Sequence, residues 1–319
     1  MRGGDVSVTV NVDNFVRAET ARMFAGVLAQ TGGVNRWMHN RVPTPIDAQT
    51  VIRMNRDTLY SSVLVDISEG ATVTLPDAGG RYMTLMVINE DHYINRTFHK
   101  AGTYDLTVEE FDTPFVGLVM RTLVDPGDAD DVATVNGIQD AVSVNAASAR
   151  PYEHPDYDEG SRKVTFDALA ALAKGVSGTA RMFGRKEEVD PVRHLLGTAV
   201  GWGGLPETEA YYYTEAEPRP VARFTLTLTD VPVDGFWSVT IYNREGFLEA
   251  NPYDSYSINN LTAVADEDGS VTLNLAADGE DLTNHLYIMD GWTYTLRLYR
   301  PRREVLDGTW SPPTPEPVA

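Results

Sequence analysis

Cysteine is absent from this chain of 319 residues, which excludes disulfides, thiolate metal sites and a cysteine nucleophile. No stretch reaches the ~18 consecutive apolar residues of a membrane-spanning helix. Residues 1–15 contain no apolar signal-peptide core after a basic start. We therefore expect a cytoplasmic protein that does not bind a membrane.

Positive charge is also scarce. The chain has 26 Lys and Arg residues against 46 Asp and Glu residues, and its formal net charge is −20. This charge opposes association with a phosphate backbone, so we expect no nucleic-acid partner. The simplest interpretation of the excess of acidic residues is a well-solvated surface. The net charge does not determine the oligomeric state, and a homo-oligomer is among the alternatives.

The sharp catalytic signatures are missing. The sequence has no G-x-S-x-G elbow, no H-E-x-x-H helix, no G-x-G-x-x-G turn after a strand and no Walker lysine loop. No two histidines have ligand spacing on a predicted element, so we expect neither a metal nor a cofactor. A catalytic or binding site must be sought in clusters of polar residues.

Two kinds of periodicity alternate along the chain. A helix is predicted over residues 13–33, with Asp13 or Asn14 as N-cap and two glycines at its end. Three more helices are predicted between the β-rich parts: residues 132–142, a helix capped by Thr165, and a helix that starts at Asp190 and Pro191. Strands are predicted at 57–67, 71–75, 82–89, 103–108, 115–123, 224–229, 236–242, 270–275 and 292–299.

These patterns predict a mainly β protein with α-helices. We expect two antiparallel modules of the β-sandwich or jelly-roll type, joined by a helical segment. The predicted division is an N-terminal module at 1–130, a helical connection at 131–205 and a C-terminal module at 206–319. The nearly continuous apolar run at 82–88 is typical of a central strand covered on both faces. The proline-rich tail from Ser311 is expected to be disordered or draped over the surface.

The first polar cluster, residues 53–62, leads directly into an apolar strand. It contains Asn55, Arg56, Asp57 and Tyr60. Charged side chains that enter a core need partners, since a buried unpaired charge is strongly disfavoured. Two readings remain open: a buried Arg–Asp network that stabilises the module, or a ligand site anchored by Arg56 and Tyr60.

The second cluster, residues 89–96, ends the most apolar strand and includes Asp91, His92 and Tyr93. Loops at strand ends commonly carry functional groups, and His92 with Asp91 supplies the residue types for acid–base work. A structural histidine that is satisfied within the core is the alternative.

The third cluster lies in the C-terminal module and combines aromatic residues with amides. Its candidate ligand-binding residues are Trp237, Tyr242, Asn251 and Tyr256. Such side chains suit neutral polar ligands such as sugars, and they suit turns and sandwich packing equally well.

Two sets of motifs carry a family resemblance. Residues 54–60, 75–82 and 89–93 resemble the N-terminal DUF1254 domain. Residues 230–238, 251–253, 256–259 and 291–301 resemble its usual C-terminal companion, DUF1214. The chain departs from the pattern at Asn284, His285, Leu286 and Tyr287. The resemblance implies two β-rich domains with helices between them, and no reaction, because both names denote domains of unknown function.

The leading hypothesis is a small-molecule enzyme, a hydrolase or lyase that uses general acid–base chemistry. In it His92 is the acid or base, Asp91 or Asp57 orients it or binds a cation, Arg56 stabilises negative charge and Tyr60 donates a hydrogen bond. Asn55 and Tyr93 would contact the substrate. The alternative is a non-catalytic β module that binds a carbohydrate-like ligand or a protein partner.

Overall fold

The computed structural model describes residues 7–49, 51–279 and 281–318, so residues 1–6 of the segment searched for a signal peptide lie outside it. The chain divides into two compact units. The first comprises residues up to 41, 59–122 and 133–206; the second comprises 42–58, 123–132 and the chain from 207 onward. The helical segment predicted as a connection thus packs within the first unit from residue 133, and residues 42–58 belong to the second.

The first unit contains two antiparallel sheets. The larger has five strands in the order β1 (Met38–His39), β2 (Thr58–Asp66), β7 (Phe115–Leu123), β4 (Met83–Asn89) and β5 (Ile94–Phe98). The smaller has the order β6 (Gly102–Leu106), β3 (Ala71–Leu75) and β8 (Ser143–Ala146). A short helix, α2 (Val108–Phe111), precedes β7.

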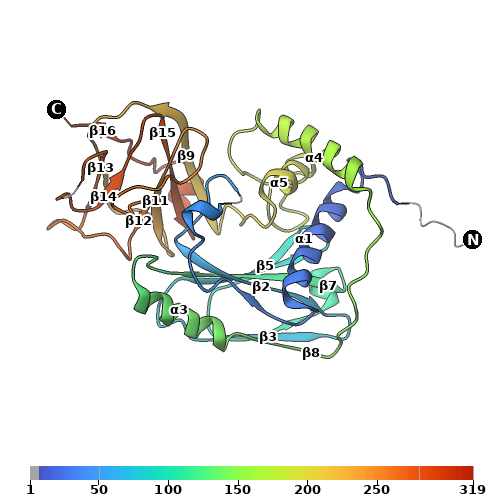
Figure 1. The fold of residues 1–319 in the computed structure, drawn as a ribbon. Coiled ribbons are helices and arrows are strands. Elements are labelled where there is room, and N and C mark those ends of the chain that lie inside the picture. Colours follow the sequence, from blue (N-terminus) through green and yellow to red (C-terminus); the bar gives the residue numbers. More distant parts are fainter. Residues whose placement is uncertain (1–6, 50, 280, 319) are drawn as a thin grey trace, which may run out of the picture. The chain divides into compact units, whose positions relative to one another are not determined.

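Both faces of the five-stranded sheet are covered. On one face, apolar side chains of β2, β4 and β7 share a core with the small sheet and with α3 (Ala129–Ala141). On the other lie α1 (Phe15–Thr31) and α5 (Pro191–Gly201), with α4 (Glu159–Ala173) packed against both helices (Figure 1). Every residue of β4 is buried as a result, which confirms the prediction of a strand covered on both sides.

Helix ends follow local chemistry. α1 ends at Gly32 in the left-handed conformation (φ 70°), where the predicted glycines stand. α5 begins as predicted, because the Asp190 carboxylate accepts hydrogen bonds from the backbone N–H groups of Val192 and Arg193. The prediction that Thr165 caps a helix is wrong. Asp158 caps α4 by accepting from the N–H of Ser161 at 2.7 Å, so the helix starts earlier.

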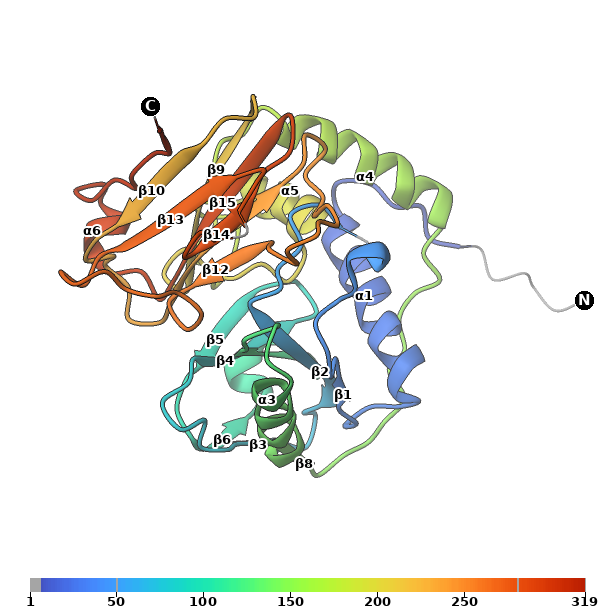
Figure 2. The same ribbon diagram turned by 60° about the vertical axis from the view of Figure 1, so that its left-hand side comes forward.

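The second unit is a β-sandwich. One sheet has the order β14 (His285–Tyr287), β13 (Val271–Ala276), β10 (Phe224–Leu228) and β16 (Glu316–Pro317). The other has the order β12 (Ser257–Asn259), β11 (Trp237–Tyr242), β15 (Trp292–Tyr299) and β9 (Ala210–Arg219). Apolar side chains of both sheets meet in one core, and Figure 2 shows strands of the two sheets. The short helices η1 (Ile46–Ala48) and α6 (Arg303–Leu306) complete this unit.

The sandwich departs from the sequence-based expectation in two places. β14 pairs with β13 in parallel, whereas all other paired strands of this unit are antiparallel. In the tail, Pro317 pairs with Phe224 and Glu316 with Thr225, so this part adds a short edge strand to a sheet and is not disordered. An edge position tolerates proline because its missing N–H needs no partner.

Candidate functional site

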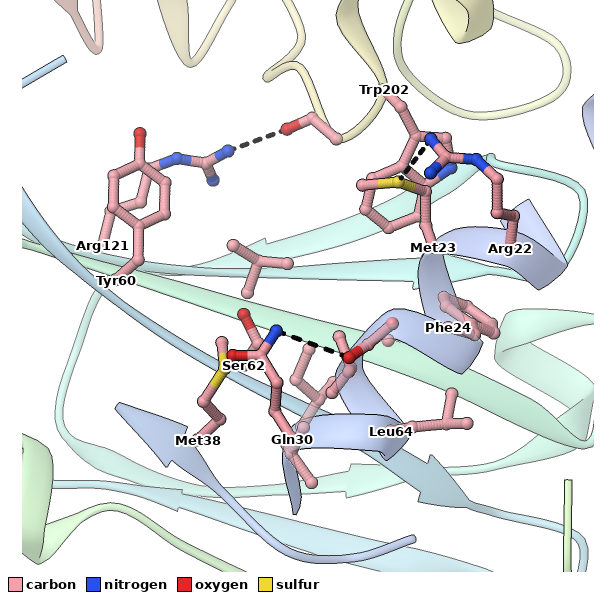
Figure 3. Close-up of a pocket in the computed structure, with 17 residues that line it drawn as sticks. Arg22, Met23, Phe24, Gln30, Met38, Tyr60, Ser62, Leu64, Arg121 and Trp202 are labelled. Atoms are coloured by element: carbon pink, nitrogen blue, oxygen red, sulfur yellow. Dashed lines mark hydrogen bonds between the residues drawn. The ribbon is translucent and has the colours of Figure 1, made fainter. Parts of the chain in front are cut away.

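The first unit contains a cavity of about 340 Å³ between α1 and the helix-facing side of the five-stranded sheet (Figure 3). This volume is within the usual range for small-molecule pockets, about 300–1,000 Å³. Its lining is mostly apolar and comes from α1, three strands and the segment after α5: Arg22, Met23, Phe24, Gly26, Val27, Gln30, Met38, Tyr60, Ser62, Val63, Leu64, Gly117, Leu118, Val119, Arg121, Trp202 and Gly203.

The floor of the pocket is set by strand alternation. Tyr60, Ser62 and Leu64 of β2 face the pocket and alternate with Val63 and Val65, which pack in the opposite core, although Val63 also borders the cavity. β2 and β7 are antiparallel. Near one end of the pair the Ile67 N–H donates a hydrogen bond to the Pro114 carbonyl, and near the other end the Val124 N–H donates to the Asp57 carbonyl. The register that they set places Tyr60 opposite Arg121, Ser62 opposite Val119 and Leu64 opposite Gly117.

One end of this floor is polar. The guanidinium of the buried residue Arg121 lies 5.2 Å from the centre of the Tyr60 ring, within the range of a cation–π contact. Its Nη2 donates a hydrogen bond of 2.7 Å to the carbonyl oxygen of Gly203, and Figure 3 shows these groups together at one side of the pocket. The Tyr60 carbonyl accepts bonds from the Asn40 N–H and the Gln139 side chain, which fix its strand.

The opposite end is closed by aromatic packing. A Cβ atom on Gly117 would lie 2.7 Å from the Phe24 ring, so only glycine allows the ring to approach β7 this closely. Trp202 packs edge-on against Phe24 and donates a hydrogen bond to the Thr20 hydroxyl. On the α1 side, a Cβ atom on Gly26 would meet nothing within 4 Å. The helix therefore leaves open space beside the cavity.

Two charged residues appear among the described lining residues, and both are arginines. Arg22 bonds to the buried carboxylate of Glu19, which Arg162 of α4 also contacts at 2.6 Å. This ion network holds α1 against α4. Arg121 stands at the other side of the cavity, next to Tyr60.

His92 lies in the wall behind the pocket and is fully buried. Its Nε2 accepts a hydrogen bond from the Gly203 N–H at 2.9 Å, and its Nδ1 pairs with the Thr198 hydroxyl at 2.8 Å. Thr198 donates to the His194 carbonyl, so Nδ1 carries the proton and the ring is neutral. Burial, and then the neighbouring His194, lower the pKa of His92 well below its usual value.

The predicted Asp91–His92 pair is not formed. The Asp91 carboxylate pairs with Arg17 of α1 instead, because consecutive residues at this turn point in different directions. Tyr93 stacks on His194 with ring centres 4.7 Å apart, and His92 stacks on both His194 and Trp202 at 5.4 Å. These rings support the segment that carries Trp202 and Gly203 into the pocket wall.

Residues of the first sequence cluster are divided between the units. Tyr60 belongs to the first unit, and Asn55, Arg56 and Asp57 belong to the second. The Arg56 guanidinium donates to the Thr44 carbonyl at 2.8 Å and lies over the Tyr256 ring. Asp57 is buried, and its Oδ1 accepts a bond of 3.1 Å from the Asn259 amide. Arg56 and Asp57 therefore have separate hydrogen-bond partners.

A second buried arginine organises the outer face of β11 and β15. Arg297 donates to the Thr240 hydroxyl, the Arg53 carbonyl and the Tyr242 hydroxyl at 2.6–2.8 Å. Tyr242 in turn donates to the Met54 carbonyl at 2.8 Å, and Asn55 donates to the Tyr299 hydroxyl. The network fastens residues 53–57 to the sandwich.

The remaining candidates of the second unit are engaged in packing and turns. Trp237 belongs to the sandwich core. The Asn251 side chain accepts from the N–H groups of Tyr253 and Ser255, which closes a turn. Tyr256 is buried beneath Arg56 and bonds to Asp254. Within the described ranges, no cluster of three or more His, Asp or Glu side chains is arranged to hold a metal ion.

Sequence reasoning missed Arg121, Trp202 and the glycines of the pocket. Arg121 was visible as a charge within the predicted strand at 115–123, where it shares one face with Val119 and Gly117. Trp202 follows a predicted helix, and no local pattern relates it to β7. The pocket therefore depends on contacts between residues far apart in the sequence.

Comparisons with known proteins agree with the motifs. Two family models match: the protein of unknown function DUF1254 at residues 34–103, and the protein of unknown function DUF1214 at residues 214–303. The predicted resemblance to both families is confirmed. In the second unit, the DUF1214 match spans most of the sandwich, and in the first the DUF1254 match includes β1 to β5.

Solved structures support the same fold. The crystal structure of the VPA0106 protein from Vibrio parahaemolyticus has a TM-score of 0.75 at 17% identity, over 97% of this chain and 98% of that one. A putative uncharacterized protein from Burkholderia cenocepacia has a TM-score of 0.53 at 14% identity, over 95% of this chain and 85% of that one. The curated proteins gave no match. Of the helices that the structure describes, none is long and apolar enough to cross a bilayer.

Proposed function

We propose that the chain binds a small, mostly apolar organic molecule in the cavity beneath α1. The observation that carries the proposal is the cavity of about 340 Å³ with a mostly apolar lining and one polar end. At roughly 30 Å³ for each water-sized group, it has room for about eleven such groups. The proposal gives Tyr60, a predicted site residue, a place in the binding site.

Filling the pocket tests this proposal. Ser62 lies in the middle of the floor, so Ser62→Phe should occupy the cavity, and Ser62→Ala is the matched control that removes the hydroxyl without adding volume. Gly26→Trp, with Gly26→Ala as its control, fills the same space from α1, where a side chain meets no obstacle.

The probe is 2-naphthol, a neutral fluorescent molecule of suitable size. We expect saturable binding to the wild-type protein, at least tenfold weaker binding to Ser62→Phe and Gly26→Trp, and little change in either alanine control. Tenfold corresponds to about 1.4 kcal/mol. An absence of saturable binding, or binding that neither filling variant weakens, would contradict the proposal.

Hydrolysis or elimination at the same pocket is the second candidate. Its support is the Tyr60 side chain, which carries a hydroxyl and whose ring lies under the Arg121 guanidinium, a group that can stabilise negative charge on a substrate oxygen. In this version Arg121 takes the role predicted for Arg56, and His92 supports the wall. Tyr60→Phe should then lower the hydrolysis of p-nitrophenyl acetate by about 10²-fold or more. An equal rate in both proteins would argue against Tyr60 catalysis and leave ligand binding untouched.

A further inference from the structure

We infer that the ligand is a planar aromatic molecule, held with its ring plane between α1 and the β2–β7 floor. This inference rests on the proposed function, because it names the ligand class of the same pocket. Three observations carry it: the cavity lies between two closely packed layers, aromatic rings of fixed orientation close one end of it, and methionine side chains line its sides.

The cavity is a slot between a helix and a sheet. Its roof is one face of α1, where the lining residues follow helical spacing: Met23, Gly26, Val27 and Gln30. Gly26 has no side chain, and a Cβ atom there would meet nothing within 4 Å. The floor below carries the short side chains of Ser62 and Val119. Small residues on both sides therefore leave the space between the two layers.

The packing of Phe24 limits the height of this slot. A Cβ atom on Gly117 would lie 2.7 Å from the Phe24 ring, so the ring rests directly on β7 and holds α1 close to the sheet. The gap beside it is therefore low. A flat ring fills a low gap and keeps carbon–carbon contacts of about 3.5–4.0 Å to both layers, whereas the puckered ring of a saturated molecule is thicker.

The aromatic end has its rings fixed before a ligand binds. Trp202 stacks on His92 with ring centres 5.4 Å apart and lies edge-on to Phe24 at 6.1 Å. The indole N–H of Trp202 donates to the Thr20 hydroxyl, and Phe24 also packs edge-on against Tyr152. Aromatic rings attract one another in edge-on or offset-stacked arrangements beyond the effect of area burial. Because these rings are already ordered, a ligand ring gains such contacts without the cost of immobilising them.

Methionine side chains line the sides of the slot. Met38 of β1 pairs with Ser62 of β2, so the two side chains lie next to each other on the floor (Figure 3). Met23 faces the slot from α1. A thioether is polarizable and makes favourable contacts with the edge of an aromatic ring. The lining therefore favours an aromatic ring over a saturated ring of similar size.

The test compares two probes that differ in aromaticity, 2-naphthol and trans-decahydro-2-naphthol, measured by calorimetry at pH 7 with the full chain. The saturated alcohol has at least as much apolar surface, so the hydrophobic effect alone predicts that it binds equally or more tightly. We expect 2-naphthol to bind at least about threefold more tightly because of its ring contacts. A smaller ratio, or tighter binding of the saturated alcohol, would overturn the inference. This comparison uses the wild-type protein and does not depend on the folding of any variant.

Variants then locate the preference. Phe24→Leu removes a ring and keeps an apolar side chain, and Phe111→Leu makes the same change in the opposite core of the sheet. The preference for 2-naphthol should fall at least about twofold in Phe24→Leu and stay unchanged in Phe111→Leu. Met38→Leu, with Met120→Leu as its control in that opposite core, should lower the preference in the same direction and is the second variant if Phe24→Leu does not fold. A preference that is undiminished in the folded variants at positions 24 and 38 would overturn the assignment.

Failure of this inference is distinguishable from failure of the proposed function. If the two alcohols bind equally and Ser62→Phe weakens both, the pocket binds ligands but does not select an aromatic ring. If Ser62→Phe weakens neither, or neither alcohol binds, the pocket is not the site and both proposals are wrong.

Discussion

Each unit contains a buried arginine stacked near a tyrosine, and the two pairs have different surroundings. Arg297 and Tyr242 lie on the outer face of β11 and β15, where their hydrogen bonds go to protein groups that fasten residues 53–57. Arg121 and Tyr60 line one end of a cavity, where Arg121 donates a hydrogen bond to the Gly203 carbonyl.

Residue type alone does not identify a site. Both pairs combine a guanidinium with a phenol, and both are held in β-strands. The distinguishing feature is the neighbouring volume: small residues around Arg121 leave a cavity, whereas Thr240 and the backbone of residue 53 surround Arg297. We therefore expect the first pair to serve binding and the second to serve stability.

The largest expected effect is on stability at Arg297. Arg297→Met removes three hydrogen bonds and leaves the Arg53 carbonyl, Thr240 and Tyr242 with unsatisfied groups in the interior. The free energy of unfolding should fall by about 3 kcal/mol or more. Urea unfolding of this variant beside Arg244→Met, an exposed arginine on the same unit, measures the difference. Equal midpoints of urea unfolding for the two variants would contradict a stabilising role of the Arg297 network.

The next effect concerns His92, whose support of the pocket wall also depends on pH. His92→Asn should cost about 1–3 kcal/mol through its lost hydrogen bonds. The backbone itself should tolerate the change, since φ at this position is 61° and asparagine adopts this region readily. Binding of 2-naphthol should weaken while the fold persists, because Gly203 and Trp202 lose their support.

The sign of the pH effect follows from the lowered pKa of His92. The unfolded chain binds a proton near the ordinary histidine pKa of about 6.5, and the folded chain does so only at lower pH. The stabilising contribution is therefore complete above about pH 6.5 and is lost as the pH falls. Wild-type stability should decline from pH 6.5 to 5.5, and His92→Asn should decline less. An equal dependence of stability on pH in the two proteins would contradict this role of His92.

The smallest effect is at Arg56. Its bond to Thr44 and its contact with the Tyr256 ring predict a loss of about 1–2 kcal/mol for Arg56→Ala, less than the rupture of a buried ion pair would cost. Arg302→Ala, which breaks an exposed pair with Asp234, should change stability less still. A larger loss at Arg302 than at Arg56 would contradict the comparison.

Much of the fold was predictable because it depends on local periodicity. The strands at 71–75, 115–123 and 292–299 have the predicted bounds, since each is a run of apolar or β-branched residues between turn signals. β9 was missed because its polar and proline-containing half, which is mostly exposed, hides the pattern. The α4 boundary was missed because Asp158 offered a stronger cap within a stretch that resembles a loop.

The candidate site was only partly predictable. Tyr60 was singled out from a dense polar run, and it lines the pocket. Its partner Arg121 is 61 positions later, and the register of β2 and β7 that brings them together is a tertiary property. His92 was singled out for its chemistry, but its hydrogen bonds to Thr198 and Gly203 depend on α5 and the turn after it. A single sequence does not specify such long-range contacts.

The most direct test of the account is a crystal structure of the protein soaked with 4-bromobenzoate, in which anomalous scattering locates the bromine. Ligand binding in the cavity of the first unit predicts a bromine peak inside that cavity. A peak at Arg297, a peak elsewhere, or a cavity without bromobenzoate at saturating concentration would contradict it.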